Sequence, residues 1–212
     1  MDAAALRRFG PIGILAIVLI LLGNLIVPPL SAVLVLVWVA LSQTPWSDIA
    51  YTPPRNWLAS TAIGIAFGVA LKLVMKSLVM PLFGAPAINP AYHYLAGNRE
   101  AALLFVPTVI VIAGFGEETL FRGWMFERLG KFVRSKTAIV ILTSLVFGAA
   151  HYTVQGVAGV EQATIVGLIF GAMVASTGRI WTAMCAHAAF DVTAVAIIYW
   201  NLEEPVAHFI FR

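Results

Sequence analysis

The chain has 212 residues, of which 61% are hydrophobic and only 11% are charged, and its net charge is +3. Soluble globular chains average about 25% charged residues, so this composition excludes a water-soluble domain. The few basic residues lie mainly in short loops, as the positive-inside rule expects, and we expect no nucleic-acid partner. The single cysteine, Cys185, excludes an internal disulfide and lies in an apolar run, where we expect a buried and unreactive thiol.

The first apolar stretch runs from about residue 11 to residue 41, which is too long for one membrane span and short for two. A helix needs about 20 apolar residues to cross a hydrocarbon core ~30 Å thick. Asn24 and the pair Pro28-Pro29 divide the stretch, because proline removes a backbone donor and clashes with the preceding turn. We expect two short spans here, at about 11–27 and 29–42.

The rest of the chain contains five further apolar stretches, separated by polar loops rich in proline, glycine or basic residues. The expected spans are 57–80, 101–129, 137–154, 163–178 and 180–200. The sequence therefore predicts an all-α, polytopic transmembrane helical bundle with about seven spans, or six if the first stretch crosses only once. No repeat or linker divides it, so residues 1–212 are expected to form a single integral membrane domain.

The most basic loop, around Lys131 and Arg134, is expected on the cytoplasmic side. With seven spans, Arg7 and Arg8 are then cytoplasmic too, and the N-terminus is predicted to lie inside. No clean cleavage site follows these arginines, so we expect the first apolar segment to be retained. The small size and short loops favour a prokaryotic inner (cell) membrane.

Lys72 and Lys76 lie one turn apart on one face of the third expected span. Lysines in such a position either line a polar path through the membrane or, more commonly, pair with a carboxylate or extend toward an interface. The sequence favours the second interpretation.

Ionisable side chains inside a membrane cost at least ~2.5–3.5 kcal/mol each near a helix centre, and are usually kept for function. The fourth expected span contains Glu117, Glu118 and Arg122 between apolar flanks. Glu118 and Arg122 are spaced to pair on one helical face. Glu117 is turned about 100° away, which leaves it free for another role, and two carboxylates in different surroundings suit acid/base chemistry.

Two histidines follow in later spans. His151 closes the segment that begins at Phe147, near the end of its span, and His187 shares a helical face with Asp191 in the last span. Because of this spacing, the carboxylate of Asp191 is expected to orient the His187 imidazole. Alanine and glycine neighbours let the helices approach closely enough for these side chains to converge.

These three elements resemble the motifs of the CPBP family, which includes type II CAAX prenyl proteases and bacteriocin-processing intramembrane proteases. The family's motifs are EExxxR, FxxxH and HxxxN or HxxxD, in that order on separate membrane helices. In this chain they read Glu117 to Arg122, Phe147 to His151, and His187 to Asp191. The resemblance covers about residues 100–195, which would form the catalytic core.

The resemblance implies hydrolysis of a peptide bond in a membrane-embedded or lipidated substrate. It implies that Glu117 is the general base, activating a water together with His151, and that His187 and Asp191 stabilise the oxyanion. Glu118 and Arg122 would hold the helix. Some members carry Asn where this chain has Asp191. An ionised Asp cannot donate to an oxyanion, so Asp191 must be protonated, orient His187 or bind a positive group.

The sequence is compatible with a zinc-dependent reaction and with a reaction that uses no metal. Glu117, His151, His187 and Asp191 together are plausible zinc ligands, and members of the family have long been called metalloproteases. The chain has no HExxH pair, and we favour a glutamate-dependent reaction without a metal.

Two other functions stay open from the residues alone. A small transporter or channel would use the buried charges to line an ion path, and a non-catalytic membrane scaffold or immunity protein would tolerate loss of Glu117. Membrane lipid is the expected surrounding in each case, and the substrate is not identified by the sequence.

Overall fold

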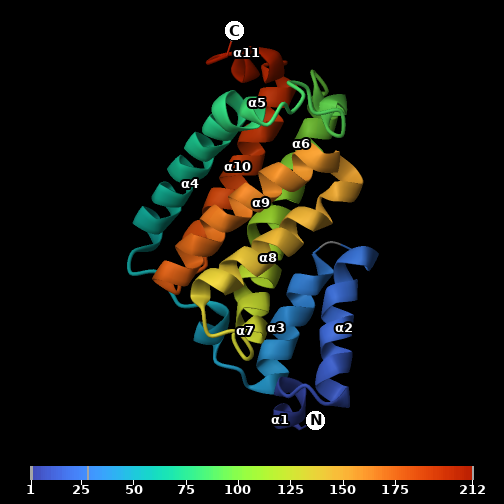
Figure 1. Ribbon diagram of the computed structural model, residues 1–212, viewed down its shortest axis with the longest axis vertical. Coiled ribbons are helices and arrows are strands. Elements are labelled where there is room, and N and C mark those ends of the chain that lie inside the picture. Colours follow the sequence, from blue (N-terminus) through green and yellow to red (C-terminus); the bar gives the residue numbers. More distant parts are fainter. Residues whose placement is uncertain (1, 28, 212) are drawn as a thin grey trace.

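The computed structural model describes residues 2–27 and 29–211, and it is a bundle of helices (Figure 1). Among those residues the only extended pairing is an isolated bridge between Tyr51 and Arg179. The helices are α1 (Ala3–Arg7), α2 (Pro11–Ile26), α3 (Leu30–Ser42), α4 (Trp57–Val74), α5 (Met80–Leu82), α6 (Arg99–Val109), α7 (Met125–Leu129), α8 (Lys136–Ala150), α9 (Tyr152–Thr177), α10 (Trp181–Tyr199) and α11 (Glu203–Ala207). Short 3₁₀ turns are η1 (Trp46–Ile49) and η3 (His93–Leu95), and π-helical segments are η2 (Met75–Val79), η4 (Ile110–Glu117) and η5 (Thr119–Trp124).

Four helical runs in the described residues are long and apolar enough to cross a membrane: Trp57–Leu82, Arg99–Leu129, Tyr152–Thr177 and Trp181–Tyr199. Three shorter apolar helices, α2, α3 and α8, account for the other expected spans. The predicted polytopic helical bundle is therefore confirmed, and the chain is an integral membrane protein.

Helices α2 and α3 are short for full membrane spans. At 1.5 Å per residue, the 16 residues of α2 are about 24 Å long and the 13 of α3 about 20 Å, against a core of ~30 Å. They lie side by side as a hairpin at the N-terminal end of the bundle (Figure 1). Pro28, to which we attributed part of this division, lies outside the described residues. Pro29 is the residue before α3 begins.

One expected boundary is wrong. We predicted a break between spans at about 155–162, but α9 is helical from Tyr152 onward. The helix is interrupted at a single residue, Gly156, with φ 62° and ψ −154°. Only glycine adopts such angles readily, so the chain bends sharply there without leaving the helix for a loop.

Helix α10, which carries the third motif, packs closely on α4 and on η4. Glycines make this packing close. A Cβ placed on Gly114 of η4 would lie 2.9 Å from the Ala188 Cβ, and one on Gly64 of α4 would lie 2.7 Å from the Cys185 Cβ. Small residues at helix contacts are typical of membrane bundles, and here they bring the helices that bear the motifs together.

The N-terminal hairpin supports the long helix from the other side. Val35 and Trp38 of α3 are buried in one apolar cluster with Leu120 and Trp124 of η5. The Trp38 and Trp124 rings meet edge to face at 6.5 Å. Through this contact the N-terminal hairpin, which carries none of the three motifs, packs against the helical run that bears Glu117 and Glu118.

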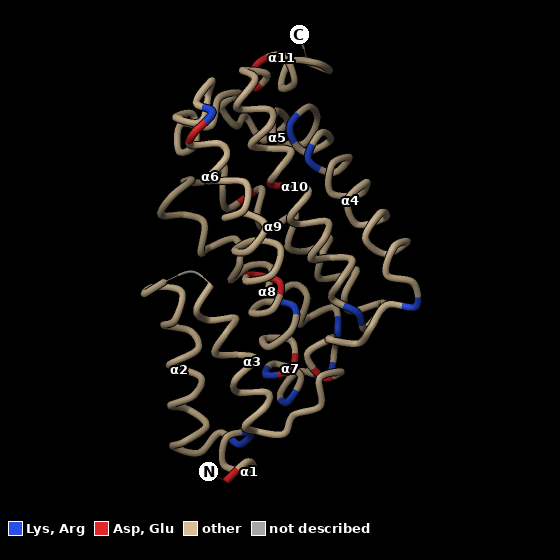
Figure 2. The backbone as a smooth tube through the Cα atoms, turned by 180° about the vertical axis from the view of Figure 1, so that it is seen from behind, with Lys and Arg blue, Asp and Glu red and all other residues tan. Residues whose placement is uncertain are grey.

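Most lysines and arginines of the described residues lie in the half of the bundle that holds the N-terminus (Figure 2). In that half the Arg128 guanidinium donates to the Arg7 carbonyl at 2.9 Å and pairs with Glu127. The N-terminal arginines and the most basic loop thus lie on the same side of the molecule, as expected from seven crossings.

Candidate active site

The centre of the site is a buried cluster of Glu118, Arg122 and His187. Glu118 and Arg122 are fully buried, and Arg122 donates from Nη1 to Glu118 Oε1 at 2.9 Å across one helical turn. The same carboxylate oxygen lies 2.7 Å from His187 Nδ1. The expected Glu118–Arg122 pair is therefore present, and it joins two motifs that are 69 residues apart.

Glu118, and not Asp191, makes the hydrogen bond that orients the His187 ring. Asp191 does lie on the same face of α10, but its Oδ2 atom is 4.0 Å from His187 Nε2, beyond hydrogen-bond distance. The physical reason is burial. Glu118 has no exposed surface and faces α10 directly, whereas the Asp191 side chain is 30% exposed.

Glu117 points to the other nitrogen of the same ring. Its Oε2 atom is 3.7 Å from His187 Nε2. That oxygen is buried and has no hydrogen-bond partner in the described part of the chain. A buried acceptor without a partner is costly unless a water or a substrate group fills the position. Glu117 and Glu118 thus lie near the two different nitrogens of the His187 imidazole.

The backbone that presents the two glutamates is π-helical on both sides of Glu118. In a π-helix the hydrogen bonds close five residues apart, and such segments are rare and often lie at functional sites. The Thr119 hydroxyl bonds the Phe115 carbonyl at 2.6 Å and the Tyr51 hydroxyl at 2.7 Å. These bonds fix the turn that carries Glu118, and sequence reasoning identified neither Thr119 nor Tyr51.

His151 stands between α8 and α9, as expected for a residue at the end of its span. Its Nδ1 atom lies 2.8 Å from the Phe147 carbonyl oxygen. A carbonyl only accepts, so Nδ1 carries the proton and donates, and a neutral ring then has Nε2 as an acceptor.

The Phe147 ring is the apolar centre around which the motifs meet. It is 2% exposed. Its ring lies 4.4 Å from the Arg122 guanidinium carbon, 4.7 Å from the His151 ring and 5.9 Å from the His187 ring. Phe147 therefore lies against both histidine rings and against the guanidinium of the Glu118–Arg122 pair.

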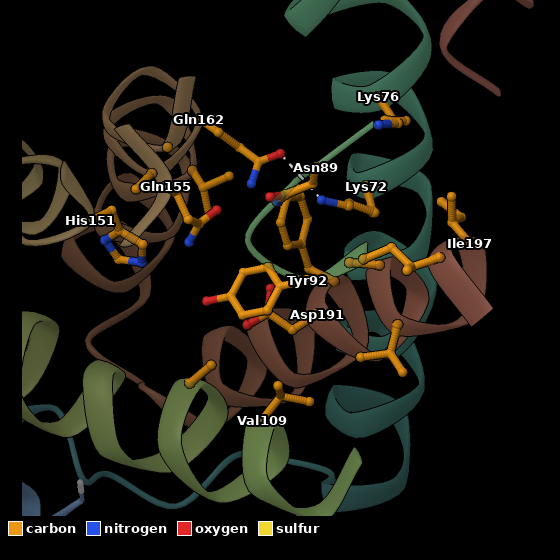
Figure 3. A pocket seen from close by; sticks show the side chains of 18 of the residues that line it. Lys72, Lys76, Asn89, Tyr92, Val109, His151, Gln155, Gln162, Asp191 and Ile197 are labelled. Carbon is orange, nitrogen blue, oxygen red and sulfur yellow. Dashed lines mark hydrogen bonds between the residues drawn. The ribbon is translucent and has the colours of Figure 1, made fainter. Parts of the chain in front are cut away.

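All four predicted catalytic side chains line one cavity of about 380 Å³: Glu117, His151, His187 and Asp191. Binding sites for small ligands commonly measure about 300–1,000 Å³. Figure 3 shows His151 and Asp191 on facing walls of this cavity, with Lys72 and Gln162 further along it. The cavity runs from these four side chains to the loop of residues 83–98.

Tyr92, in that loop, is a lining residue that the sequence analysis missed. Burial, together with the nearby charges of Asp191 and Glu117, raises the pKa of its phenol to about 12. Its hydroxyl therefore keeps its proton at neutral pH and is a neutral donor at the cavity wall. A loop residue gives no periodic signal, and only the fold brings Tyr92 next to Asp191.

The described residues do not form a ready zinc site. No group of three or more His, Cys, Asp or Glu side chains in them has an arrangement that would hold a metal ion. His187 Nδ1 is already bonded to Glu118, and the Nε2 atom is 3.7 Å and 4.0 Å from the nearest carboxylates. We therefore derive no step of the reaction through a metal.

Comparison with known proteins gives one match. Residues 99–193 match the family model described as type II CAAX prenyl endopeptidase Rce1-like. The match spans all three motifs and confirms the resemblance to the CPBP intramembrane proteases. No curated protein and no solved structure gives a significant match.

Proposed function

We propose that this chain, whose residues 99–193 match the Rce1-like type II CAAX prenyl endopeptidases, is an intramembrane endopeptidase. Its substrate would be a membrane-embedded or lipidated peptide, hydrolysed by a water that Glu117 and His151 activate. The observation that carries the proposal is the buried Glu117 Oε2, which has no partner in the described residues and lies 3.7 Å from His187 Nε2. A water bound at this position would donate a hydrogen bond to the Glu117 carboxylate and lie close to the His187 Nε2 atom.

In the proposed reaction, Glu117 takes a proton from the water while the water oxygen attacks the carbonyl carbon. His151 Nε2 accepts a hydrogen bond from the second hydrogen of the water, which stays on the oxygen, and so orients a lone pair toward that carbon. His187 acts as an imidazolium, donating from Nδ1 to Glu118 and from Nε2 to the oxyanion. Glu117 then passes its proton to the leaving nitrogen as the C–N bond breaks. Asp191 contributes negative charge beside Nε2, which favours the imidazolium.

The test is cleavage of a mixed pool of transmembrane and prenylated peptides by the purified protein in liposomes. Wild type is expected to generate new peptide termini, detected by mass spectrometry. The His187→Gln variant should cleave about 10²–10³-fold more slowly, because loss of one oxyanion donor typically has this effect. His208→Gln is the matched control, since His208 is exposed near the C-terminus and away from the cavity.

Equal rates for wild type and His187→Gln would contradict the proposed role of this ring and indicate a contaminating protease. Absence of cleavage by wild type on every peptide of the pool would count against the endopeptidase proposal itself.

We further propose that the reaction needs no metal. Treating the active protein with EDTA or 1,10-phenanthroline, followed by removal of the chelator, should leave the cleavage rate within about twofold of the untreated rate. Glu117 would act on water directly, so no ligand would be lost. Loss of activity that zinc restores would contradict this and make Glu117, His151, His187 and Asp191 the first ligands to examine.

The orientation is also a proposal. We infer that the N-terminus and the basic loop that includes Lys131 are cytoplasmic, in a prokaryotic inner membrane. The support is that most lysines and arginines of the described residues lie in the half of the bundle that holds the N-terminus (Figure 2).

A further inference from the structure

Lys72 lies inside the cavity, and among the described residues it forms no ion pair. The residue is 8% exposed, in the apolar middle of the run from Trp57 to Leu82. Its Nζ atom donates to the Gln162 amide oxygen at 3.2 Å and stands 4.6 Å from the centre of the Phe190 ring. In the part of the chain that the structure describes, no carboxylate lies within 4.0 Å of it. The carboxylates of Asp191 and Glu203 act on the ammonium only from beyond that distance, and a buried cation without a directly paired anion is costly.

The neighbouring lysine is different, although the sequence treats the two alike. Lys76 donates to the Ala87 carbonyl and lies 4.0 Å from Glu203. Glu203 in turn bonds His93 and the Asn89 backbone. Lys76 therefore holds the loop of residues 83–98 against α11, as expected for a lysine paired with a carboxylate. Among the described residues, Lys72 has no carboxylate partner of this kind.

The position of Lys72 relates it to the reaction. Phe190, the ring beneath its Nζ atom, is one turn along α10 from His187. At 1.5 Å per residue that is about 4.5 Å along the helix, so Nζ is on the order of 5–10 Å from the His187 ring. An extended peptide covers about 3.3–3.6 Å per residue. A group bound at Lys72 would therefore belong to a residue roughly one to three positions from the scissile bond.

The surroundings of Nζ suit a carboxylate. A lysine ammonium carries three donors, and here one is used by Gln162. The remaining donors are available to an acceptor in the cavity, and Gln155 and Tyr92 line the same space with amide and hydroxyl groups (Figure 3). Hydrogen bonds from a charged donor to a charged acceptor are the strong ones.

We propose that Lys72 is the specificity-determining residue of a carboxylate subsite, which binds an anionic carboxylate of the peptide substrate within a few residues of the bond that is cut. The carboxylate is either the free C-terminus or an acidic side chain. This inference rests on the proposed endopeptidase function, and it adds the chemical class of substrate that the cavity selects.

The test is equilibrium binding of three N-acetylated apolar tetrapeptides to the protein in nanodiscs. One peptide has a free C-terminal carboxylate, the second is its C-terminal amide, and the third is an amide with one glutamate side chain. Wild type should bind at least one of the two acidic peptides about 10- to 100-fold more tightly than the neutral amide, as expected for a charged hydrogen bond. Which acidic peptide is preferred identifies the source of the carboxylate.

Three variants make the result specific. Lys72→Gln should bind all three peptides equally, and Lys72→Arg should keep the preference because it keeps the charge. Lys76→Gln is the matched control, one turn away on the same wall, and should also keep it. Equal binding of acidic and neutral peptides by wild type, or no binding of any, would overturn the proposal. So would a preference that Lys76→Gln loses and Lys72→Gln keeps.

Cleavage measured in the same samples separates this inference from the proposed function. Cleavage without any preference for acidic peptides would reject the carboxylate subsite and leave the endopeptidase standing. A Lys72-dependent preference with no peptide cleaved would support the subsite and count against the endopeptidase.

Discussion

Replacing Glu117 by glutamine is expected to lower kcat by about 10²–10⁴-fold, the usual contribution of a general base. Glutamine keeps the size of the side chain and one acceptor oxygen, so a substrate should still bind and KM should change little. A loss confined to kcat is the result expected when an interaction with the transition state is removed. The measurement is steady-state cleavage of one peptide in liposomes, at concentrations on both sides of KM.

Glu100→Gln is the matched control for this variant. Glu100 lies on the same long helical run as Glu117 but is exposed in its first turn, so both steady-state constants should stay near those of wild type. The midpoint temperature of thermal unfolding of Glu117→Gln should not be lower than that of wild type, because the carboxylate is replaced by a neutral group at a buried position. Unchanged kcat in Glu117→Gln would reject Glu117 as the base.

The helices could be predicted from the sequence because the bilayer imposes a simple pattern. Runs of about 20 apolar residues closed by proline, glycine and basic loops mark spans directly. Hydropathy predicts helix boundaries less well where a bend depends on the backbone conformation of a single residue. The bend at Gly156 depends on one glycine with φ 62°, and nothing in the hydropathy of residues 152–162 separates a bent helix from a loop.

The site was predicted in part. Spacing within one helix placed Glu118 with Arg122, and His187 with Asp191, because residues four apart share a face. Spacing gives no information about which face of one helix meets which face of another. The hydrogen bond from His187 to Glu118 joins two helices, and it gives Glu118 a part in orienting the imidazole that its own motif does not suggest.

Lys72 and Lys76 also show that sequence spacing does not determine which side chain finds a partner on another helix. Both are lysines on one face of the same apolar helix, one turn apart. The pairing with a carboxylate that is expected for both is present only for Lys76 among the described residues. Its partner, Glu203, is on α11 and far away in sequence. Which of the two lysines forms an ion pair is therefore a property of the tertiary fold.

Replacing Arg122 by leucine is expected to lower the free energy of unfolding by about 3–5 kcal/mol, because it removes the guanidinium that pairs with the buried Glu118 carboxylate. Leucine keeps an apolar contact with the Phe147 ring, on which the guanidinium now lies at 4.4 Å. The loss should therefore come from charge and not from packing. The measurement is reversible unfolding in mixed micelles, with Arg99→Leu as the control, since Arg99 is exposed at the start of α6.

The double variant Glu118→Gln/Arg122→Leu separates stability from catalysis. Only one hydrogen bond joins the two side chains, and Glu118 Oε2 and Arg122 Nη2 are buried without partners in the described residues. Such a pair contributes little net stability, whereas one member left alone is costly. Removing both charges should thus restore most of the free energy lost in Arg122→Leu. Cleavage should stay low, because a neutral glutamine no longer stabilises the His187 imidazolium. Restored cleavage in the double variant would show that the charge of Glu118 serves the fold alone.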